Sequence, residues 1–272
     1  MSLKIRLIGS LALVCVFSAI ASAQPPAPES GIIGIAHIAF RVSDLDQEIA
    51  FLGKLGYQES FAMNSGKSIA EVFVKINDRQ FIELYPRTDP SQPLGWMHVC
   101  YEVGDLNVLH DFYGSMGLKL QPVRKAGAGN LISAVDDPEG RVTEFTQYVE
   151  GSKHMLDKGQ HLGPSRVSTQ LIGFDLPVRD GAAEKEFYTD LGFEPQDAGS
   201  SVRFTAPGAP ELRIALRPAQ AGSPPEFHFP VPDARKAAGQ LKDAGVNATR
   251  NDKLVFVHDP DGNMFIFLEA GV

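Results

Sequence analysis

A four-residue pattern that recurs four times along the chain constrains the fold more than any other feature. The pattern is any residue, Val, any residue and Asp, and it occupies residues 41–44, 102–105, 177–180 and 230–233. In every copy a glycine follows the aspartate by twelve residues, at Gly56, Gly117, Gly192 and Gly245. A repeat of this kind indicates several copies of one structural unit. We therefore expect four units of the same architecture.

The local patterns within one copy predict a strand, a helix and three further strands. Residues 35–44 (IAHIAFRVSD) alternate in polarity, as a strand does, and Asp44 is placed as a helix N-cap. Apolar residues at helical spacing follow, and Gly56 is placed to end the helix. The strands that follow are expected over 57–63, 69–76 and 80–85 in the first copy, and over 118–124, 131–135 and 141–148 in the second.

Two histidines occupy equivalent positions in the first two copies. His37 lies on the polar face of the strand at 35–44, and His98 lies on the polar face of the strand at 96–105 (WMHVCYEVGD). Each is followed 46 residues later by a glutamate, Glu83 or Glu144. A single histidine on a strand is usually a core or surface residue, but the repeated spacing makes these four side chains candidates for a common site.

The first 23 residues have the pattern of a signal peptide. Lys4 and Arg6 precede an uncharged apolar run over 7–20, and Ala-Ser-Ala at 21–23 is a cleavage pattern. The run is short for a membrane span, although a retained anchor is the alternative. We expect a periplasmic or secreted protein without a membrane contact after cleavage. Residues 24–33 begin with a Pro-rich stretch and are expected to form a disordered tether.

The charge balance bounds the partners of the chain. Asp and Glu number 33 against 25 Lys and Arg, which gives a formal net charge of −8. Binding to nucleic acid needs a basic face, so we exclude nucleic acid and expect a small-molecule partner. Once the leader is removed only Cys100 remains, so no intramolecular disulfide can form and stability must come from the core.

Residues 150–169 separate the second copy from the third. The segment is polar and has no clear periodicity, and it is longer than most connections within compact domains. A domain linker is one interpretation. A lid over a neighbouring cleft is the other, and it would have His154 and His161 available.

Four β-α-β-β-β units with a histidine on the first strand and a glutamate on the last resemble the vicinal oxygen chelate superfamily. Residues 34–57 (GIAHIAFRVSDLDQEIAFLGKLGY) and 135–145 (VDDPEGRVTEF) carry the resemblance, which spans residues 34–269. It implies an α+β fold in which four βαβββ modules pair into two open, cup-shaped mixed sheets. The module pairs would be 34–149 and 170–272. Pairing within one chain or between two chains is left open, so a homodimer is possible.

The resemblance also implies one divalent metal ion at the bottom of the first cup. The matching ligand positions are His37, Glu83, His98 and Glu144, and such donors suit Zn, Ni, Co, Mn or Fe. The third and fourth copies have Gly173, Ala215, Glu226 and Ile266 at these positions, so the second pair is expected to be metal-free and to have a structural or substrate-shaping role. His228 is displaced by two residues and is interpreted as a core or cleft histidine.

The filled position at Glu83 favours proton-transfer chemistry of the glyoxalase type, a lyase or isomerase reaction. The substrate would be small, oxygen-rich and chelated through vicinal oxygens. By this analogy Glu144 is the general base, with Glu83 as a second catalytic carboxylate. Arg41 shares the strand face of His37 and could contact an anionic substrate. Cys100 is interpreted as a buried small hydrophobe rather than a fifth ligand.

Two alternatives belong to the same family. In extradiol Fe(II) dioxygenases, as the resemblance implies, the position that matches Glu83 is not a ligand. A non-catalytic binding or resistance protein would use the cup to sequester a small molecule and would turn nothing over.

Overall fold

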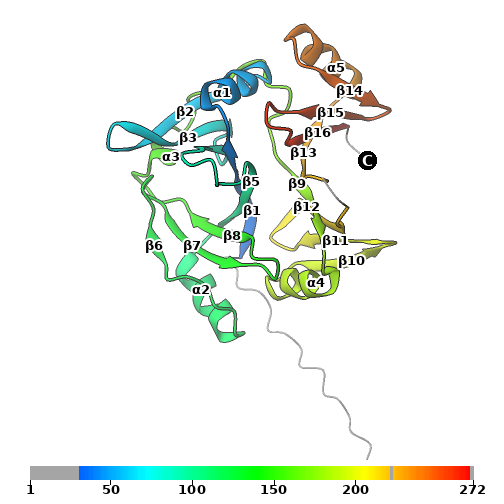
Figure 1. Cartoon of the computed structure of the whole chain (residues 1–272). Coiled ribbons are helices and arrows are strands. Elements are labelled where there is room, and N and C mark those ends of the chain that lie inside the picture. The colour runs from blue at the N-terminus through cyan, green and yellow to red at the C-terminus, as the bar shows by residue number, and fades with distance from the viewer. Residues whose placement is uncertain (1–30, 221–222, 270–272) are drawn as a thin grey trace, which may run out of the picture.

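The strands form two eight-stranded mixed sheets that lie side by side (Figure 1). The computed structural model describes residues 31–220 and 223–269. The predicted signal peptide at 1–23 and most of the predicted tether at 24–33 therefore lie outside the described residues. The first strand begins at Ile32, within the range assigned to the tether.

The first sheet is built from the first two copies of the repeat. Its order is β2-β3-β4-β1-β5-β8-β7-β6. The strands are β1 (Ile32–Val42), β2 (Gln58–Ser65), β3 (Ser68–Asn77), β4 (Gln80–Pro86), β5 (Gly95–Val103), β6 (Arg124–Lys125), β7 (Leu131–Asp136) and β8 (Val142–Gln147).

The second sheet repeats this order with the third and fourth copies, as β10-β11-β12-β9-β13-β16-β15-β14. The strands are β9 (Gly173–Val178), β10 (Glu194–Ala198), β11 (Ser201–Ala206), β12 (Ala209–Pro218), β13 (Glu226–Val231), β14 (Ala248–Asn251), β15 (Leu254–His258) and β16 (Met264–Glu269).

Each copy contributes one ten-residue helix. The helices are α1 (Leu45–Lys54), α2 (Leu106–Ser115), α4 (Gly181–Asp190) and α5 (Ala234–Asp243). The aspartate of each repeat caps its helix by accepting hydrogen bonds from backbone N–H groups of the first turn. The four repeat glycines have φ angles of +88°, +93°, +87° and +70°, which is the left-handed conformation that ends a helix.

The modules of each half pair through their first strands. In the first half β1 runs antiparallel to β5, while β4 and β8 lie parallel to β1 and β5 on either side. The second half repeats this arrangement with β9, β13, β12 and β16. The expected α+β fold of four modules in two mixed sheets is confirmed, and the modules pair within one chain.

The prediction of a strand over 118–124 is wrong in its bounds. Instead of a strand over 118–124, only Arg124–Lys125 pairs in the sheet, as β6. Pro122 has no N–H to give to a ladder. The segment lies beside β7 through two isolated bonds, from Gln121 N to Ala134 O at 2.7 Å and from Ser133 Oγ to Gln121 O at 2.6 Å.

The main core lies between the two sheets. The apolar faces of β1 and β5 point into it, and aromatic side chains from both halves meet there. Phe40 packs on Phe227 with ring centroids 5.2 Å apart, and Tyr101 packs on Phe193 at 5.3 Å. Because one face of each sheet is buried in this core, the opposite face is left to carry polar chemistry.

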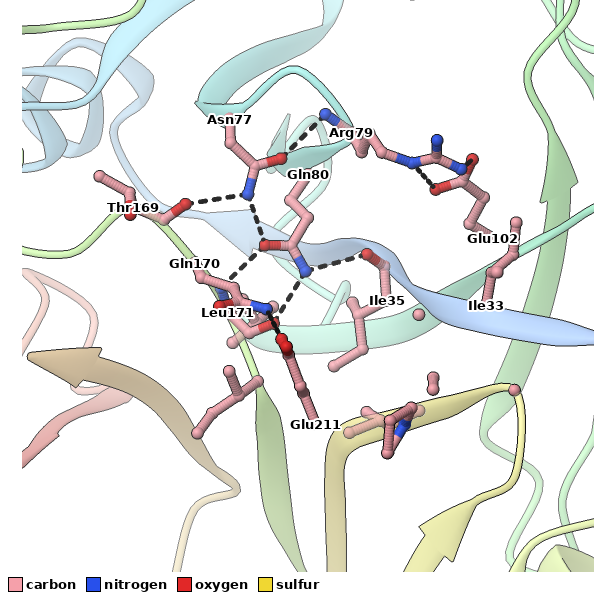
Figure 2. Close-up of a pocket in the computed structure, with 16 residues that line it drawn as sticks. Ile33, Ile35, Asn77, Arg79, Gln80, Glu102, Thr169, Gln170, Leu171 and Glu211 are labelled. Carbon is pink, nitrogen blue, oxygen red and sulfur yellow. Dashed lines mark hydrogen bonds and ion pairs between the residues drawn. The ribbon is translucent and has the colours of Figure 1, made fainter. Parts of the chain in front are cut away.

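A buried glutamine joins the two halves beside this core (Figure 2). The amide nitrogen of Gln80 donates to Ile35 O at 3.1 Å and to Leu171 O at 2.8 Å, and its oxygen accepts from Leu171 N at 2.9 Å. Asn77 also donates to this oxygen, at 2.8 Å. The network fixes the chain that enters the second half against β1 and β4.

The segment 150–169 packs against the first sheet. It contains a short helix, α3 (Lys153–Leu156), whose His154 lies among the rings of Phe61, Phe73 and Phe81 at centroid distances of 4.7 to 5.0 Å. The fully buried Lys75 on β3 donates to Asp157 Oδ2 at 2.8 Å and so fixes the segment to the sheet. No helix among the described residues is long and apolar enough to cross a membrane.

Candidate metal centre

The four predicted ligands come from the four central strands of the first sheet. His37 lies on β1, Glu83 on β4, His98 on β5 and Glu144 on β8. Ala39 is the register partner of both Glu83 and His98, and Cys100 is the partner of both His37 and Glu144. Partners across a ladder point to the same side, so all four side chains project from one face. We call this the inner face; it is opposite the core.

Three of these side chains converge through one atom each. His37 Nε2 lies 3.1 Å from His98 Nε2 and 3.2 Å from Glu144 Oε2. His98 Nε2 lies 3.7 Å from the same oxygen of Glu144. The three atoms therefore form a small triangle of lone-pair donors around one point.

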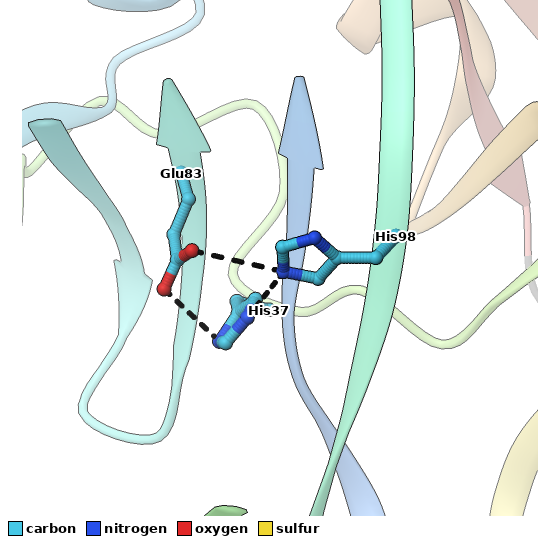
Figure 3. A group of neighbouring side chains, drawn as sticks. All are labelled: His37, Glu83 and His98. Carbon is cyan, nitrogen blue, oxygen red and sulfur yellow. Dashed lines mark hydrogen bonds and ion pairs between the residues drawn. The ribbon is translucent and has the colours of Figure 1, made fainter. Parts of the chain in front are cut away.

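Glu83 faces both histidines from β4, on the far side of β1 from His98 (Figure 3). Its Oε1 is 3.3 Å from His37 Nδ1, and its Oε2 is 3.9 Å from His98 Nε2. The Oε2 atom also accepts a hydrogen bond from the hydroxyl of Tyr85 at 3.0 Å. Glu83 thus faces both rings, but it meets His37 on the side opposite the triangle.

The electrostatics of the centre reflect burial and close opposite charges. Burial alone would lower the pKa of His37, but Glu83 and Glu144 outweigh it and the pKa is raised. Burial and the charge of His37 lower the pKa of His98 to about 4. Burial raises the pKa of Glu83 to about 7, while His37 and His98 overcome the effect of burial at Glu144 and lower its pKa.

The residues fit a divalent cation. Two imidazole nitrogens that face each other at 3.1 Å need a proton or a metal ion between them, because two lone pairs would repel. Two imidazoles with carboxylates suit first-row divalent ions. His37, Glu83 and His98 offer ligand atoms within 4.8 Å of one another, and so do His37, Cys100 and Glu144.

The exposed fractions of the side chains show from which side a substrate can approach. Those of Glu83 and His37 are 5% and 7%, whereas those of His98 and Glu144 are 13% and 17%. The open side of the centre is therefore the side of His98 and Glu144.

Two further residues, Tyr85 and Cys100, lie in the neighbourhood of the centre. Tyr85 was not singled out from the sequence, although its position two residues after Glu83 on the same strand could have indicated it. Cys100 is fully buried, as expected, and its thiol also lies within 4.8 Å of a ligand atom of His37 and of one of Glu144. Burial and the charges of Glu144 and Glu83 raise the pKa of its thiol, which favours the protonated form.

Two other predicted residues lie at the edges of the inner face. Arg41 donates to Pro93 O at 3.2 Å, so its guanidinium is held by the loop before β5. His154 packs against Phe73 and Phe81, which share the inner face with Glu83. The segment 150–169, which contains α3 and is called the α3 segment below, therefore fills part of this face and limits the space beside the centre.

A family model matches both halves of the chain. It describes the glyoxalase/bleomycin resistance protein/dioxygenase superfamily and matches residues 34–145 and 170–267. Among curated proteins no relative was found by sequence.

Several solved structures share the fold. The Mn(II)-bound glyoxalase from Novosphingobium aromaticivorans is 16% identical, with a TM-score of 0.64, over 88% of this chain and 83% of that one. The 2,3-dioxygenase LapB from Pseudomonas sp. KL28 is 17% identical, with a TM-score of 0.67, over 90% of this chain and 94% of that one. These likenesses establish the fold and leave the reaction to be argued from the site.

Proposed function

Because the chain belongs to the glyoxalase/bleomycin resistance protein/dioxygenase superfamily, we propose that it is an enzyme with one divalent metal ion held by His37, Glu83, His98 and Glu144. Its reaction is proton transfer of the glyoxalase type, on a small substrate chelated through vicinal oxygens. The observation that carries the proposal is the convergence of two imidazoles and two carboxylates on the inner face of the first sheet.

A metal ion bound there would act as a Lewis acid that stabilises negative charge on the substrate oxygens. His37 and His98 hold the centre through Nε2. Glu83 would supply a further carboxylate ligand, since its Oε2 lies 3.9 Å from His98 Nε2. Tyr85 keeps this carboxylate beside the rings through its hydroxyl.

Glu144 is the proposed general base. It is the more exposed of the two carboxylates and lies on the open side of the centre, where a substrate can approach. There it can take a proton from a carbon next to a substrate carbonyl and return it to a neighbouring atom. Glu83 is enclosed by His37, His98 and Tyr85. Its proposed role is therefore to help hold the metal ion, and it does not reach the substrate.

Arg41 is the proposed contact for an anionic group of the substrate. It lies on the same face of β1 as His37, four residues nearer the end of the strand, and its bond to Pro93 O holds the guanidinium at that end. Export is a further part of the proposal and rests on the signal-peptide pattern at 1–23.

A second candidate is an extradiol-type Fe(II) dioxygenase, and one observation favours it. Glu83 contacts Nδ1 of His37, on the side opposite Nε2. This leaves His37, His98 and Glu144 as a set of two histidines and one carboxylate, which is the ligand set of non-haem Fe(II) oxygenases. In this arrangement Glu83 would orient His37 through Nδ1 without touching the metal ion.

Replacement of Glu83 by Gln separates the two candidates. We would load the untagged chain with Fe(II), Zn(II), Ni(II), Co(II) and Mn(II) and measure bound metal, oxygen consumption with catechols, and isomerisation of 2-oxoaldehyde adducts. Proton-transfer chemistry predicts that Glu83→Gln loses metal and activity together. Retained iron with oxygen consumption would support the dioxygenase, and ligand binding without turnover by any loaded form would contradict both.

A further inference from the structure

The inner face of the second sheet carries a second group of ligand-capable side chains. Asp175 lies on β9, and Glu226 and His228 lie on β13. One ligand atom from each lies within 4.8 Å of the others, and His228 Nε2 is 3.7 Å from Asp175 Oδ1. Two adjacent strands thus bring two carboxylates and one imidazole to one place.

This group does not use the four positions of the first sheet. Glu226 pairs with Asp175 as His98 pairs with Ala39, and His228 pairs with Gly173 as Cys100 pairs with His37. Asp175 and His228 therefore stand where the first sheet has Ala39 and Cys100. Comparison of the four expected positions alone could not reveal the group, because two of its three members are displaced by two residues.

The three residues of the group line a cavity of about 560 Å³. Apolar side chains form much of its wall, including Ile214, Phe256 and Ile266, and Gln196, Thr205 and two arginines add polar atoms. Cavities of 300 to 1,000 Å³ with apolar walls and a few converging polar groups are typical of small-molecule sites. A bound ion would therefore have open coordination positions on the side of the cavity.

The carboxylate of Glu226 is oriented from outside the group. Arg217 donates to Glu226 Oε1 at 3.0 Å and to Pro224 O at 2.7 Å, which fixes the carboxylate at the start of β13. Asp175 is partly buried, with 29% of its side chain exposed, and this burial raises the pKa of its carboxyl group although Arg217 and Arg203 act in the opposite direction. A bound cation would offset the remaining cost of removing the carboxylate from water. Its near neighbour His228 supplies a nitrogen ligand for the same ion.

We propose that Asp175, Glu226 and His228 form a second divalent-cation site, separate from the centre on the first sheet. One imidazole and two carboxylates suit Mn, Fe, Co and Zn. The three ligands leave positions open towards the cavity, where an oxygen-bearing organic ligand can complete the coordination. Arg203 and Arg213 line the same cavity and favour an anionic ligand. The second half would then be a binding site in its own right.

Cobalt tests this proposal, because Co(II) is both countable and coloured. The untagged full chain is stripped of metal, incubated with Co(II), passed over a desalting column and analysed by elemental mass spectrometry and visible absorption. The wild-type chain should bind two Co(II) ions. His228→Ala should bind one and lose part of the visible spectrum, and Glu226→Gln should do the same. Circular dichroism checks that each variant is folded.

Three variants complete the design. His258→Ala replaces an exposed histidine at the end of β15 and should still bind two ions. His98→Ala should keep one ion, and that ion should be lost when His228→Ala is added. A wild-type chain that binds one ion, lost in His98→Ala and unaffected by His228→Ala, overturns the second site. One ion that depends on His228 alone supports the second site and contradicts the first centre instead.

Discussion

Glu83 contacts His37 through Nδ1, at 3.3 Å, on the opposite side of the ring from the nitrogen that faces His98. The carboxylate can therefore fix the orientation of the ring while Nε2 stays free for a metal ion. It can also join the coordination sphere, because its second oxygen lies near His98. Whether Glu83 acts as ligand or as orienting residue decides between the two candidate reactions.

Glu83→Gln should weaken metal binding more than an orienting residue alone would. Loss of a residue that orients a metal ligand without touching the ion typically reduces metal affinity about 10- to 100-fold. We expect a loss beyond about 100-fold if Glu83 is a ligand, measured by competition with a chelating dye. A loss within the lower range, with activity on a catechol retained, would contradict the four-ligand account.

Tyr85→Phe should weaken metal binding by about 10-fold, as removal of an outer partner does. The hydroxyl donates to Glu83 Oε2 at 3.0 Å and holds the carboxylate beside the histidines. Tyr148→Phe is the matched control, since it removes a hydroxyl that donates to Arg79 O at 2.9 Å and not to a proposed ligand. Equal affinities for the two variants would argue against this role of Tyr85.

Glu48→Gln should stabilise the protein at neutral and alkaline pH. Burial, with the charges of Asp259 and Asp261, raises the pKa of Glu48 to about 9 from an ordinary value of 4.5. Between these values the folded state binds a proton that the unfolded state has released, so stability falls as pH rises. Glutamine removes this dependence.

Thermal unfolding at pH 5 and pH 8 measures the effect of Glu48→Gln. A gain of 1 kcal/mol raises the Tm of a chain of this size by about 2 to 4 °C, and the gain should be larger at pH 8. Asp46→Asn, an exposed acid on the same helix, should show no such difference between the two pH values. A gain that is equal at both values would show that Glu48 is ionised in the folded protein.

Lys75→Met should destabilise the fold and release the α3 segment. Lys75 is fully buried and pairs with Asp157 at 2.8 Å and with Asp78 at 2.9 Å. Removal of one partner from a buried pair leaves an uncompensated charge and costs about 3 to 5 kcal/mol. Urea unfolding measures the loss, and proteolysis within 150–169 should become faster. The exposed Lys158→Met is the control and should change neither quantity.

The repeat predicted most of the fold because it combines three local signals. An aspartate cap, a helical spacing and a glycine in the left-handed conformation define each helix without tertiary information, and all four helices form where this combination occurs. The strand expected over 118–124 failed because Pro122 prevents a regular ladder and only β6 pairs. Alternation of polar and apolar residues alone does not show whether a segment can form a regular hydrogen-bonded ladder with a neighbouring strand.

The site was predictable only in part. Identical spacing identified His37, Glu83, His98 and Glu144, and the structure brings all four together. Which nitrogen of His37 meets Glu83 depends on ring orientation, and the sequence does not carry that information. The sequence did not indicate Asp175, because Glu226 and His228 on β13 become its neighbours only through strand register.

Metal content in the His228→Ala background is the most direct test of the central claim. This variant removes the second proposed site, so the first centre can be counted alone by elemental mass spectrometry on the untagged chain. We predict one divalent ion per chain, and none when His98→Ala is added. An ion that persists without His98, or no ion under any loading condition, would contradict a metal centre at His37, Glu83, His98 and Glu144.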